Sequence, residues 1–285
     1  MMNLKEIKHR IQSVKSTQKI TSAMKLVSAA KLRRTQSAIE GMLPYKEKLD
    51  SMLVNLLSHV RRLDTPYTAS REMKKVIVIA VASDTNMCGA FNANILRFAR
   101  EVVAGYRTQG VSVELYPVGI KMKEAFARTG VAMCEDMMPN AGAPKYDAVA
   151  AAASSLMRRF AAGDIDRIEL VYTRYISASR LLPSRETFLP VDVECGTDAA
   201  HNSGYIVEPG REEVLRSLLP KAICLRLYTA LLDSAVAEHS ARMIAMQVAT
   251  DNADGLISEL TLEYNKGRQQ AITNELLDII SGSFM

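Results

Sequence analysis

The chain carries a long helix-forming segment at each end, and this arrangement constrains its fold more than any other feature. The patterns predict one helix from Met1 to about Val60 and another from Lys221 to about Ser281. At 1.5 Å per residue, each helix would be roughly 80–95 Å long, whereas globular helices usually run 8–20 residues. Helices that flank a compact middle must pack together or extend apart. Because both are amphipathic and similar in length, we expect an antiparallel pair.

The first segment shows the spacing of a coiled coil. Apolar residues from Leu4 to Val14 follow one another at intervals of three and four, which is the pattern of a buried seam. A second series runs from Thr35 to Leu56. We interpret the second series as out of register with the first, and Pro44 lies within it. These two features predict drift and a bend rather than an ideal supercoil.

The middle of the chain alternates strand and helix patterns, which favours a parallel sheet in three layers. The run VIVIAVA at 76–82 is typical of a strand that is covered on both faces. We place a short helix at 211–219, which Pro220 separates from the final long helix. The other expected elements are strands at 111–118 and 167–175, an edge strand at 187–194, and helices at 94–109, 121–128 and 146–162.

Charge differs sharply between the two ends of the chain. Residues 1–34 hold nine cations and one acid, a net charge of +8, whereas residues 252–285 hold five acids and two cations, a net charge of −3. Part of this difference is neutralised if the ends pack together, but the surplus predicts an acidic partner surface. Four isolated cysteines indicate buried thiols of a reducing compartment. We expect no signal peptide and a soluble protein, because the longest strongly apolar run is too short to span a membrane.

The residues that support catalysis or cofactor binding are missing from the middle segment. Gly89 is the only glycine between Val76 and Asn94, which excludes a GxGxxG fingerprint. The four histidines lie far apart, and no Gly-x-Ser-x-Gly motif occurs. Asp84, at the end of a strand, could be a metal ligand or an acid, but a residue of this kind more usually caps the turn that it begins. We therefore predict no catalytic, cofactor-binding or metal-binding residues.

Four stretches resemble the gamma-subunit family of F-type ATP synthases. The resemblance covers both terminal segments almost completely and the middle in its general order. The stretches are IKHRIQSVKSTQKITSAMKLVSAAKLRR at 7–34, SDTNMCGAFN at 83–92, EHSARMIAMQVATDNA at 238–253 and TLEYNKGRQQAITNELLDIISG at 261–282.

The resemblance implies a fold and a set of partners. The fold is α/β plus coiled coil: residues 1–62 and 210–285 form an antiparallel coiled-coil shaft, and residues 74–205 form an inserted Rossmann-like three-layer α/β foot domain. The shaft turns inside a hexamer of alpha and beta subunits, and the foot sits on the c-ring together with the epsilon subunit. The chain would be a peripheral, non-catalytic subunit at the cytoplasmic face of the bacterial inner membrane. It would couple ion-driven rotation of the c-ring to ATP synthesis or hydrolysis in the beta subunits.

The resemblance also implies contact residues, each of which has a plainer interpretation. Lys19, Met24 and Lys25 match the region that couples to the beta subunits, although Met24 is equally typical of a coiled-coil seam and Lys25 of a solvated face. The remaining contacts are Arg268 and Gln269 with a beta-subunit loop, Leu276, Leu277, Ile279 and Ile280 as an apolar bearing tip, and Tyr205 and Glu208 with the c-ring.

The chain departs from the family pattern at three places. Thr85 and Asn86 stand where Arg-Gly is usual, and residues 283–285 replace small apolar residues. Gly267 stands where alanine is usual, and a glycine inside a helix costs about 1 kcal/mol relative to alanine.

Two other functional classes are consistent with parts of the pattern. A basic coiled coil could bind nucleic acid, and its affinity would then fall steeply with salt. The apolar seam and the lack of interleaved aromatic residues argue against that interpretation. A dehydrogenase-like enzyme with helical extensions would bind dinucleotides.

Overall fold

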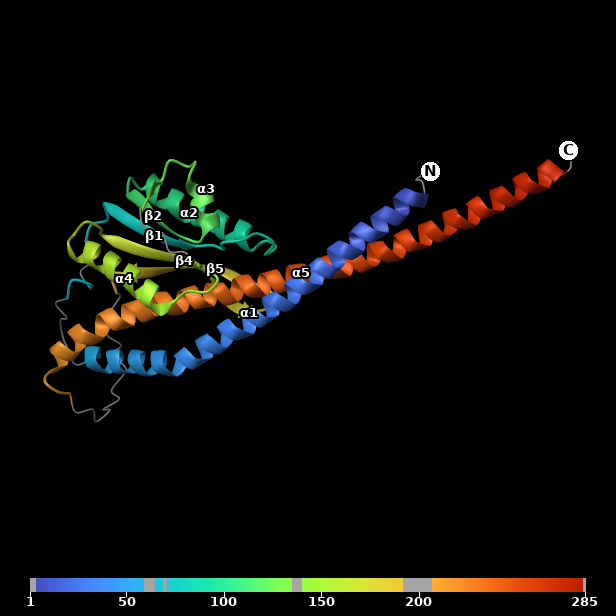
Figure 1. Cartoon of the computed structure of the whole chain (residues 1–285). Helices are drawn as coiled ribbons and strands as arrows, with labels where there is room; N and C mark the ends of the chain where they lie inside the picture. Colours follow the sequence, from blue (N-terminus) through green and yellow to red (C-terminus); the bar gives the residue numbers. More distant parts are fainter. Residues whose placement is uncertain (1–3, 59–64, 69–70, 135–139, 192–206, 284–285) are drawn as a thin grey trace. The chain divides into compact units, whose positions relative to one another are not determined.

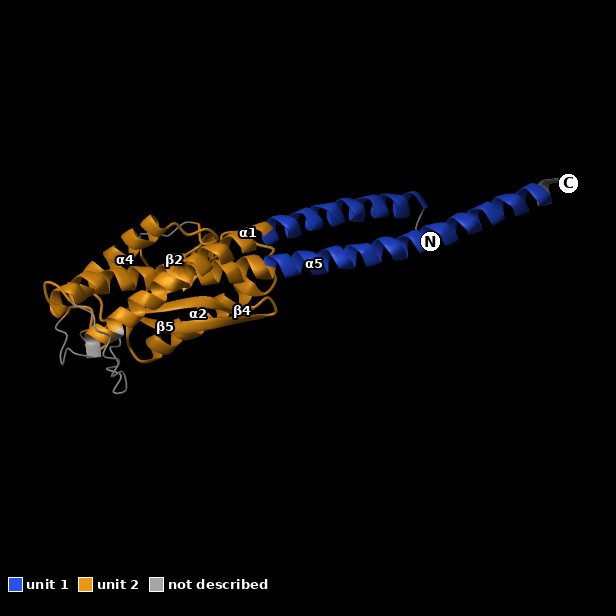
Figure 2. Ribbon diagram, turned by 90° about the horizontal axis from the view of Figure 1, so that it is seen from below, with its two compact units in different colours: residues 1–29, 242–285 blue, residues 30–241 orange. Residues whose placement is uncertain are grey.

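The computed structural model describes residues 4–58, 65–68, 71–134, 140–191 and 207–283. They form two compact units, which Figure 2 shows in different colours. The coiled-coil unit comprises residues 1–29 and 242–285, and the α/β unit comprises residues 30–241. The long terminal helices each contribute residues to both units.

Each terminal helix is unbroken along the described chain. Helix α1 spans Leu4–Ser58 and helix α5 spans Arg211–Ser283, with Pro44 inside the first and Pro220 inside the second. The expected break at Pro220 is therefore wrong. Proline removes one helical hydrogen bond and crowds the preceding turn, but its neighbours Leu219 and Ile223 are both buried in the core. Their burial holds this turn in the helix.

The seam of α1 keeps one register, so the expected drift is also wrong. Counting from Leu4 in alternating steps of three and four reaches Gln18, Leu32 and Thr35, and continues to Leu56. Every residue at these positions is buried or half-buried, which is the signature of a heptad repeat. Thr35, Met42, Leu49 and Leu56 of the second series therefore belong to the same repeat as the first. The other members of that series, Ala38, Tyr45 and Met52, are exposed and lie outside the seam.

Helix α5 repeats the pattern in the coiled-coil unit. The half-buried or buried positions again follow one another at three and four, and they end at Ala271. This seam consists of Met246, Thr250, Ala253, Ile257, Leu260, Tyr264, Gly267 and Ala271.

A five-stranded sheet forms the centre of the α/β unit, with strand order β3-β2-β1-β4-β5 (Figure 1). The first four strands are parallel, and β5 runs antiparallel to β4. This arrangement confirms the expected α/β class. The strands are β1 (Lys75–Val81), β2 (Ser112–Val118), β3 (Ala132–Met133), β4 (Arg167–Ser177) and β5 (Arg180–Leu189).

Helices cover both faces of the sheet. Helices α2 (Phe91–Thr108) and α3 (Ile120–Phe126) pack on one face, over a core that includes Val78 and Leu115. Helix α4 (Tyr146–Ala161) and the first part of α5 pack on the other face, over a core that includes Ile79 and Leu170 (Figure 1). The central strands read as continuous apolar runs because they are buried on both sides.

The edges of the sheet differ from expectation. We expected an edge strand at 187–194, but β5 begins at Arg180 and turns back directly from β4. Its sequence RLLPSRETFL contains Pro183 and alternating polar residues, which weakens the strand pattern. The two-residue strand β3 was not predicted, because two residues give no periodic signal.

A buried carboxylate fastens β4 to its neighbours. Glu169 is 1% exposed, and its carboxylate accepts hydrogen bonds from Arg167, Arg185 and the hydroxyl of Tyr106. Burial alone would raise the pKa of Glu169, but the hydrogen bonds and the two guanidinium charges outweigh it and lower that pKa. The cluster joins β4, β5 and α2, so it holds the antiparallel edge strand in register.

Replacing this carboxylate should destabilise the α/β unit in a pH-dependent way. We expect Glu169→Gln to cost roughly 3 kcal/mol at neutral pH, because it leaves a buried charge network incomplete. A lowered folded-state pKa contributes stability above the ordinary value near about 4.3 and loses it below. The difference in free energy of unfolding between the variant and the native protein should therefore shrink as the pH falls below about 4.3. Urea unfolding at several pH values measures this difference.

Helix α2 offers a matched control. Glu101 is exposed, so Glu101→Gln should change stability by less than about 0.5 kcal/mol at every pH. A Glu169→Gln variant that behaves like this control would refute the fastening role.

Candidate functional site

The paired helices of the coiled-coil unit hold most of the residues that the sequence singles out. Three hydrogen bonds cross the seam between α1 and α5. Gln18 Nε2 donates to Asp254 Oδ1 at 2.8 Å, and Lys25 Nζ donates to Gln247 Oε1 at 2.9 Å. Between them, the hydroxyls of Thr21 and Thr250 lie 2.9 Å apart. As residue numbers rise in α1 they fall in α5, so the pair is antiparallel.

These contacts form a polar segment within an otherwise apolar seam. Leu4, Ile7, Ile11 and Val14 occupy the seam positions on the amino-terminal side of Gln18. A polar pair in a coiled-coil seam fits only one register, so it specifies alignment while burying less apolar surface. Sequence reasoning missed this segment, although a count of threes and fours from Val14 leads directly to Gln18, Thr21 and Lys25.

Gly267 faces a side chain of the opposite helix. A Cβ atom built on Gly267 would lie 3.1 Å from Leu4 Cδ2, whereas one built on Gly255 would meet nothing within 4 Å. The missing side chain at 267 therefore makes room for Leu4. This contact gives a physical reason for the departure from alanine at this position.

The two helices of this unit carry opposite charge. Residues 4–29 hold six cations and one acid, and residues 242–283 hold three cations and six acids. One side of the pair is thus electropositive and the other electronegative. Lys15 and Lys19 are exposed on the first, and Glu259 and Glu263 on the second.

The structure separates the predicted beta-subunit contacts by environment. Lys19, Arg268 and Gln269 are exposed, whereas Met24 is half-buried. Lys25 is half-buried at the seam and bonded to Gln247, so it is not simply a solvated cation.

The predicted bearing and c-ring contacts lie elsewhere on the chain. The bearing tip is exposed, with side chains between 52% and 68% accessible: Leu276, Leu277, Ile279 and Ile280. Glu208 is exposed just before α5 begins, and Tyr205 lies outside the described residues. The predicted contacts therefore occupy separate stretches rather than one pocket.

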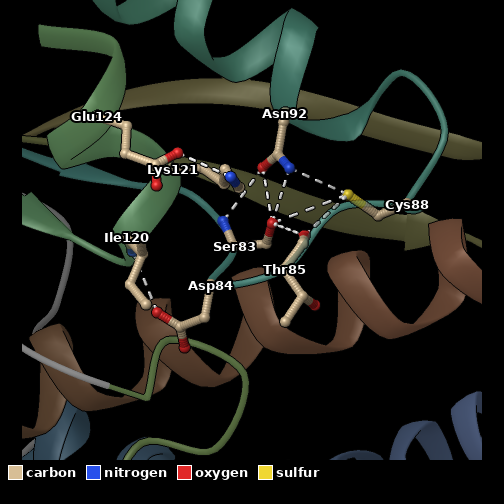
Figure 3. A network of polar contacts seen from close by, with 8 residues as sticks. All are labelled: Ser83, Asp84, Thr85, Cys88, Asn92, Ile120, Lys121 and Glu124. Atoms are coloured by element: carbon tan, nitrogen blue, oxygen red, sulfur yellow. Dashed lines mark hydrogen bonds and ion pairs between the residues drawn. The ribbon is translucent and has the colours of Figure 1, made fainter.

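The turn after β1 contains Thr85 and Asn86, and its own hydrogen bonds close it (Figure 3). Ser83 is fully buried, and its hydroxyl donates to the carbonyl of Thr85 at 2.6 Å. Asn92 Nδ2, from α2, donates to Ser83 Oγ at 2.7 Å and to Cys88 Sγ at 3.2 Å. The contact with residue 85 uses its backbone, so this closure does not depend on the side chain there.

Asp84 extends from the same turn to a neighbouring helix. Its Oδ1 accepts a hydrogen bond from the backbone N–H of Ile120 at 3.1 Å, at the start of α3 (Figure 3). We expected Asp84 to cap its own turn, but its carboxylate instead caps the first N–H of α3. Gly119 makes this approach possible, because a Cβ there would lie 2.1 Å from the carbonyl oxygen of Ala82.

The cysteine thiols are consistent with structural roles. Cys88 and Cys224 are buried, Cys134 is half-buried and Cys195 lies outside the described residues. Burial, together with the neighbouring Glu114, raises the pKa of the Cys134 thiol to about 12. In the described part of the chain, no three His, Cys, Asp or Glu side chains gather closely enough to hold a metal ion.

Comparison with known proteins covers almost the entire chain. Residues 3–284 match the sequence model of the family described as ATP synthase. The ATP synthase gamma chain of Phocaeicola vulgatus is 47% identical over 287 residues, covering 99% of each chain. The gamma chain of Bacteroides thetaiotaomicron is 45% identical over 296 residues, again covering 99% of both. The chain belongs to the ATP synthase gamma chain family.

Solved structures share the fold of this gamma chain. A chain of the Euglena gracilis mitochondrial ATP synthase assembly of OSCP, F1 and c-ring matches with a TM-score of 0.61 at 20% identity, covering 98% of this chain and 92% of that one. A chain of the Tetrahymena thermophila central stalk and c-ring matches with a TM-score of 0.60 at 23% identity, covering 81% and 99%. The fold of two long helices around an α/β domain is thus that of ATP synthase central stalks, and membership of the gamma chain family assigns the chain a central-stalk role.

The two glycines of α5 allow a test of the seam in this gamma chain. Gly255→Ala should stabilise the helix by about 1 kcal/mol, because nothing obstructs the new methyl group. Gly267→Ala should stabilise the helix less, because the new methyl group must push Leu4 aside. Hydrogen exchange of α5 amides measures both changes locally.

A third substitution identifies the cause of any difference. In a protein that already carries Leu4→Ala, Gly267→Ala should stabilise the helix by the full amount expected for Gly255→Ala. Equal gains from the two single glycine substitutions would show that Leu4 does not restrict position 267.

Proposed function

We propose that this chain is the non-catalytic rotor of an F-type ATP synthase, turning inside a hexamer of alpha and beta subunits. The observation that supports this most strongly is the similarity to gamma chains, which covers 99% of this chain at 45–47% identity. A rotor needs no reactive group; it needs different surfaces that face its neighbours in turn. Each surface then favours a different state of the neighbouring subunit, and rotation shifts those populations in sequence.

The opposite charge of the two helices would supply such surfaces. As the coiled-coil unit turns, a fixed site on the surrounding ring would face the cationic α1 side and then the acidic α5 side. An exposed ion pair contributes only about 0–1 kcal/mol. Weak contacts suit a moving part, because no single one would hold the rotor at one angle.

The exposed ends of the helices suit contacts with other subunits. The apolar tip at 276–280 is exposed, so an apolar sleeve in the hexamer would cover it. Because apolar contact is non-directional, the sleeve would not hold the tip at one angle. Arg268 and Gln269, about two helical turns before the tip begins at Leu276, would hydrogen-bond to a loop of a beta subunit. Glu208 and Tyr205, which precede α5 in the sequence, would face the polar loops of the c-ring. The epsilon subunit would lie beside the α/β unit.

The association with a membrane would be indirect. Within the described residues, the structure contains no helix that is long and apolar enough to span a bilayer. We propose that the chain reaches the cytoplasmic face of the bacterial inner membrane as a peripheral subunit, through the c-ring.

Reconstitution with the alpha and beta subunits of the same organism tests the proposed function. The three purified components should form a stable complex whose ATP hydrolysis is cooperative and requires this chain. Size-exclusion chromatography and a steady-state ATPase assay provide the two measurements. Failure of the chain to enter the complex would eliminate the rotor proposal.

A double substitution tests the proposed contact with the beta subunits. Arg268→Ala with Gln269→Ala should reduce ATP-driven ion pumping per ATP hydrolysed in membrane vesicles. Both side chains are exposed, so the stability of the chain should change by less than about 0.5 kcal/mol. Lys266→Ala, an exposed neighbour, is the matched control. Normal pumping by the double variant would remove these two residues from the coupling site.

A further inference from the structure

The coiled-coil unit exposes a band of aliphatic side chains at one level of the helix pair. The hydrogen bonds between Thr21 and Thr250 and between Lys25 and Gln247 place residues 20–27 of α1 beside residues 244–251 of α5. At 1.5 Å per residue, these segments are about 12 Å long. Their exposed aliphatic side chains, between 37% and 65% accessible, are named the girdle here: Ile20, Leu26, Val27, Ile244 and Val248.

The girdle lies on both outer sides of the pair. Its members alternate with the buried and half-buried seam residues of their own helices, among them Thr21 and Ser28 on α1 and Met246 and Thr250 on α5. A residue off the seam points away from the opposite helix, and the outer sides of two paired helices face in opposite directions. A single flat partner could therefore cover the α1 part or the α5 part of the girdle, but not both.

The neighbouring stretch of the helix pair is different. Leu256 and Leu262 are exposed on α5, but the exposed residues of α1 from 8 to 19, which lie opposite them, are all polar. Aliphatic side chains on both sides at one level are therefore a local feature of the girdle. Exposed apolar surface that gathers in this way marks an interaction site.

We propose that the girdle is a second bearing, at which the subunits that surround the rotor close on the helix pair from all sides. This inference rests on the rotor function proposed above and specifies where the surrounding ring touches the chain. A second copy of the chain fits the girdle less well, because copies joined through two opposite sides would continue into open assemblies instead of a closed dimer. A ring covers both sides at once.

Apolar contact suits a bearing at this level. It is non-directional, so it would centre the helix pair without favouring one angle of rotation. Charged residues beside the girdle would supply the difference between angles, since Lys19 is exposed on α1 and Asp251 is exposed on α5. We therefore expect the surrounding loops to place apolar side chains on the girdle and polar groups around it, as protein interfaces usually do.

Thiol labelling of the reconstituted complex tests the girdle on both sides. Leu26→Cys and Val248→Cys each place a thiol on the outer side of one helix, and a charged maleimide measures how accessible that thiol is. Both should react about tenfold more slowly in the complex with the alpha and beta subunits than in the free chain, because a packed interface excludes water and solutes. The native chain gives the background rate of its own cysteines, and thermal unfolding establishes that each variant is folded.

Ser16→Cys is the matched control on α1, because Ser16 is exposed but lies outside the girdle. Its thiol should react at a similar rate in the free chain and in the complex. Equal protection of all three thiols would show that the ring encloses the pair without a local contact, and it would overturn the proposal.

The remaining outcomes separate the girdle from the rotor function. Failure of the native chain to enter the complex would contradict the rotor function itself. A complex that forms while either girdle thiol stays fully reactive would refute the second bearing alone, because contact would then be absent or one-sided. Protection that grows with the concentration of the free chain would show instead that the girdle joins copies of this chain.

Discussion

The antiparallel pairing of α1 with α5 is the constraint on which the rest of the structure depends. Each helix buries one stripe at intervals of three and four residues, and the two stripes meet in a single alignment. Apolar side chains alone would tolerate a shift by a heptad. The contact of Thr21 with Thr250 does not tolerate it, because a shift by seven residues would place Thr21 opposite Met243 or Ile257. The alignment of the pair is therefore specified by its least apolar part.

This pairing also explains why a chain of this kind can carry a two-sided charge. A seam that holds the helices together by burial leaves their outer faces unconstrained, so α1 can be basic and α5 acidic without loss of association. The attraction between the two helices adds a little to their pairing. The remaining field is available to neighbours, and it changes sign around the helix pair.

The parts of the fold that were predicted are those with long or pure patterns. The terminal helices repeat their pattern over dozens of residues, and β1 is an uninterrupted β-branched run. The failures have specific physical causes. Strand β5 holds its place through Arg185, which reaches Glu169 on the neighbouring strand, a contact invisible in the local sequence. Pro220 stays helical because of what Leu219 and Ile223 bury, again a tertiary effect.

The candidate contacts show a similar division between pattern and environment. Exposure at Arg268 and at the apolar tip follows from their place in the pattern of a helix, beyond or beside the last seam residues. The seam position of Lys25 was missed because a lysine in a basic stretch invites a solvated interpretation. The unbroken spacing of three and four residues was the available signal, but the polar residues at those positions concealed the seam.

Two acids of the α/β unit show how the balance between burial and charged partners decides the pKa of a group in this fold. Burial favours a higher pKa for both Glu169 and Asp233. For Glu169 two guanidinium groups outweigh that cost, so its charge stabilises the unit above about pH 4. For Asp233 burial outweighs the attraction of Arg174 and Lys46, so the stability of the folded protein falls as the pH rises from about 4 to about 6 and does not recover above it. The two acids therefore act in opposite directions as the pH rises, and the geometry of the cationic side chains around each one sets the sign.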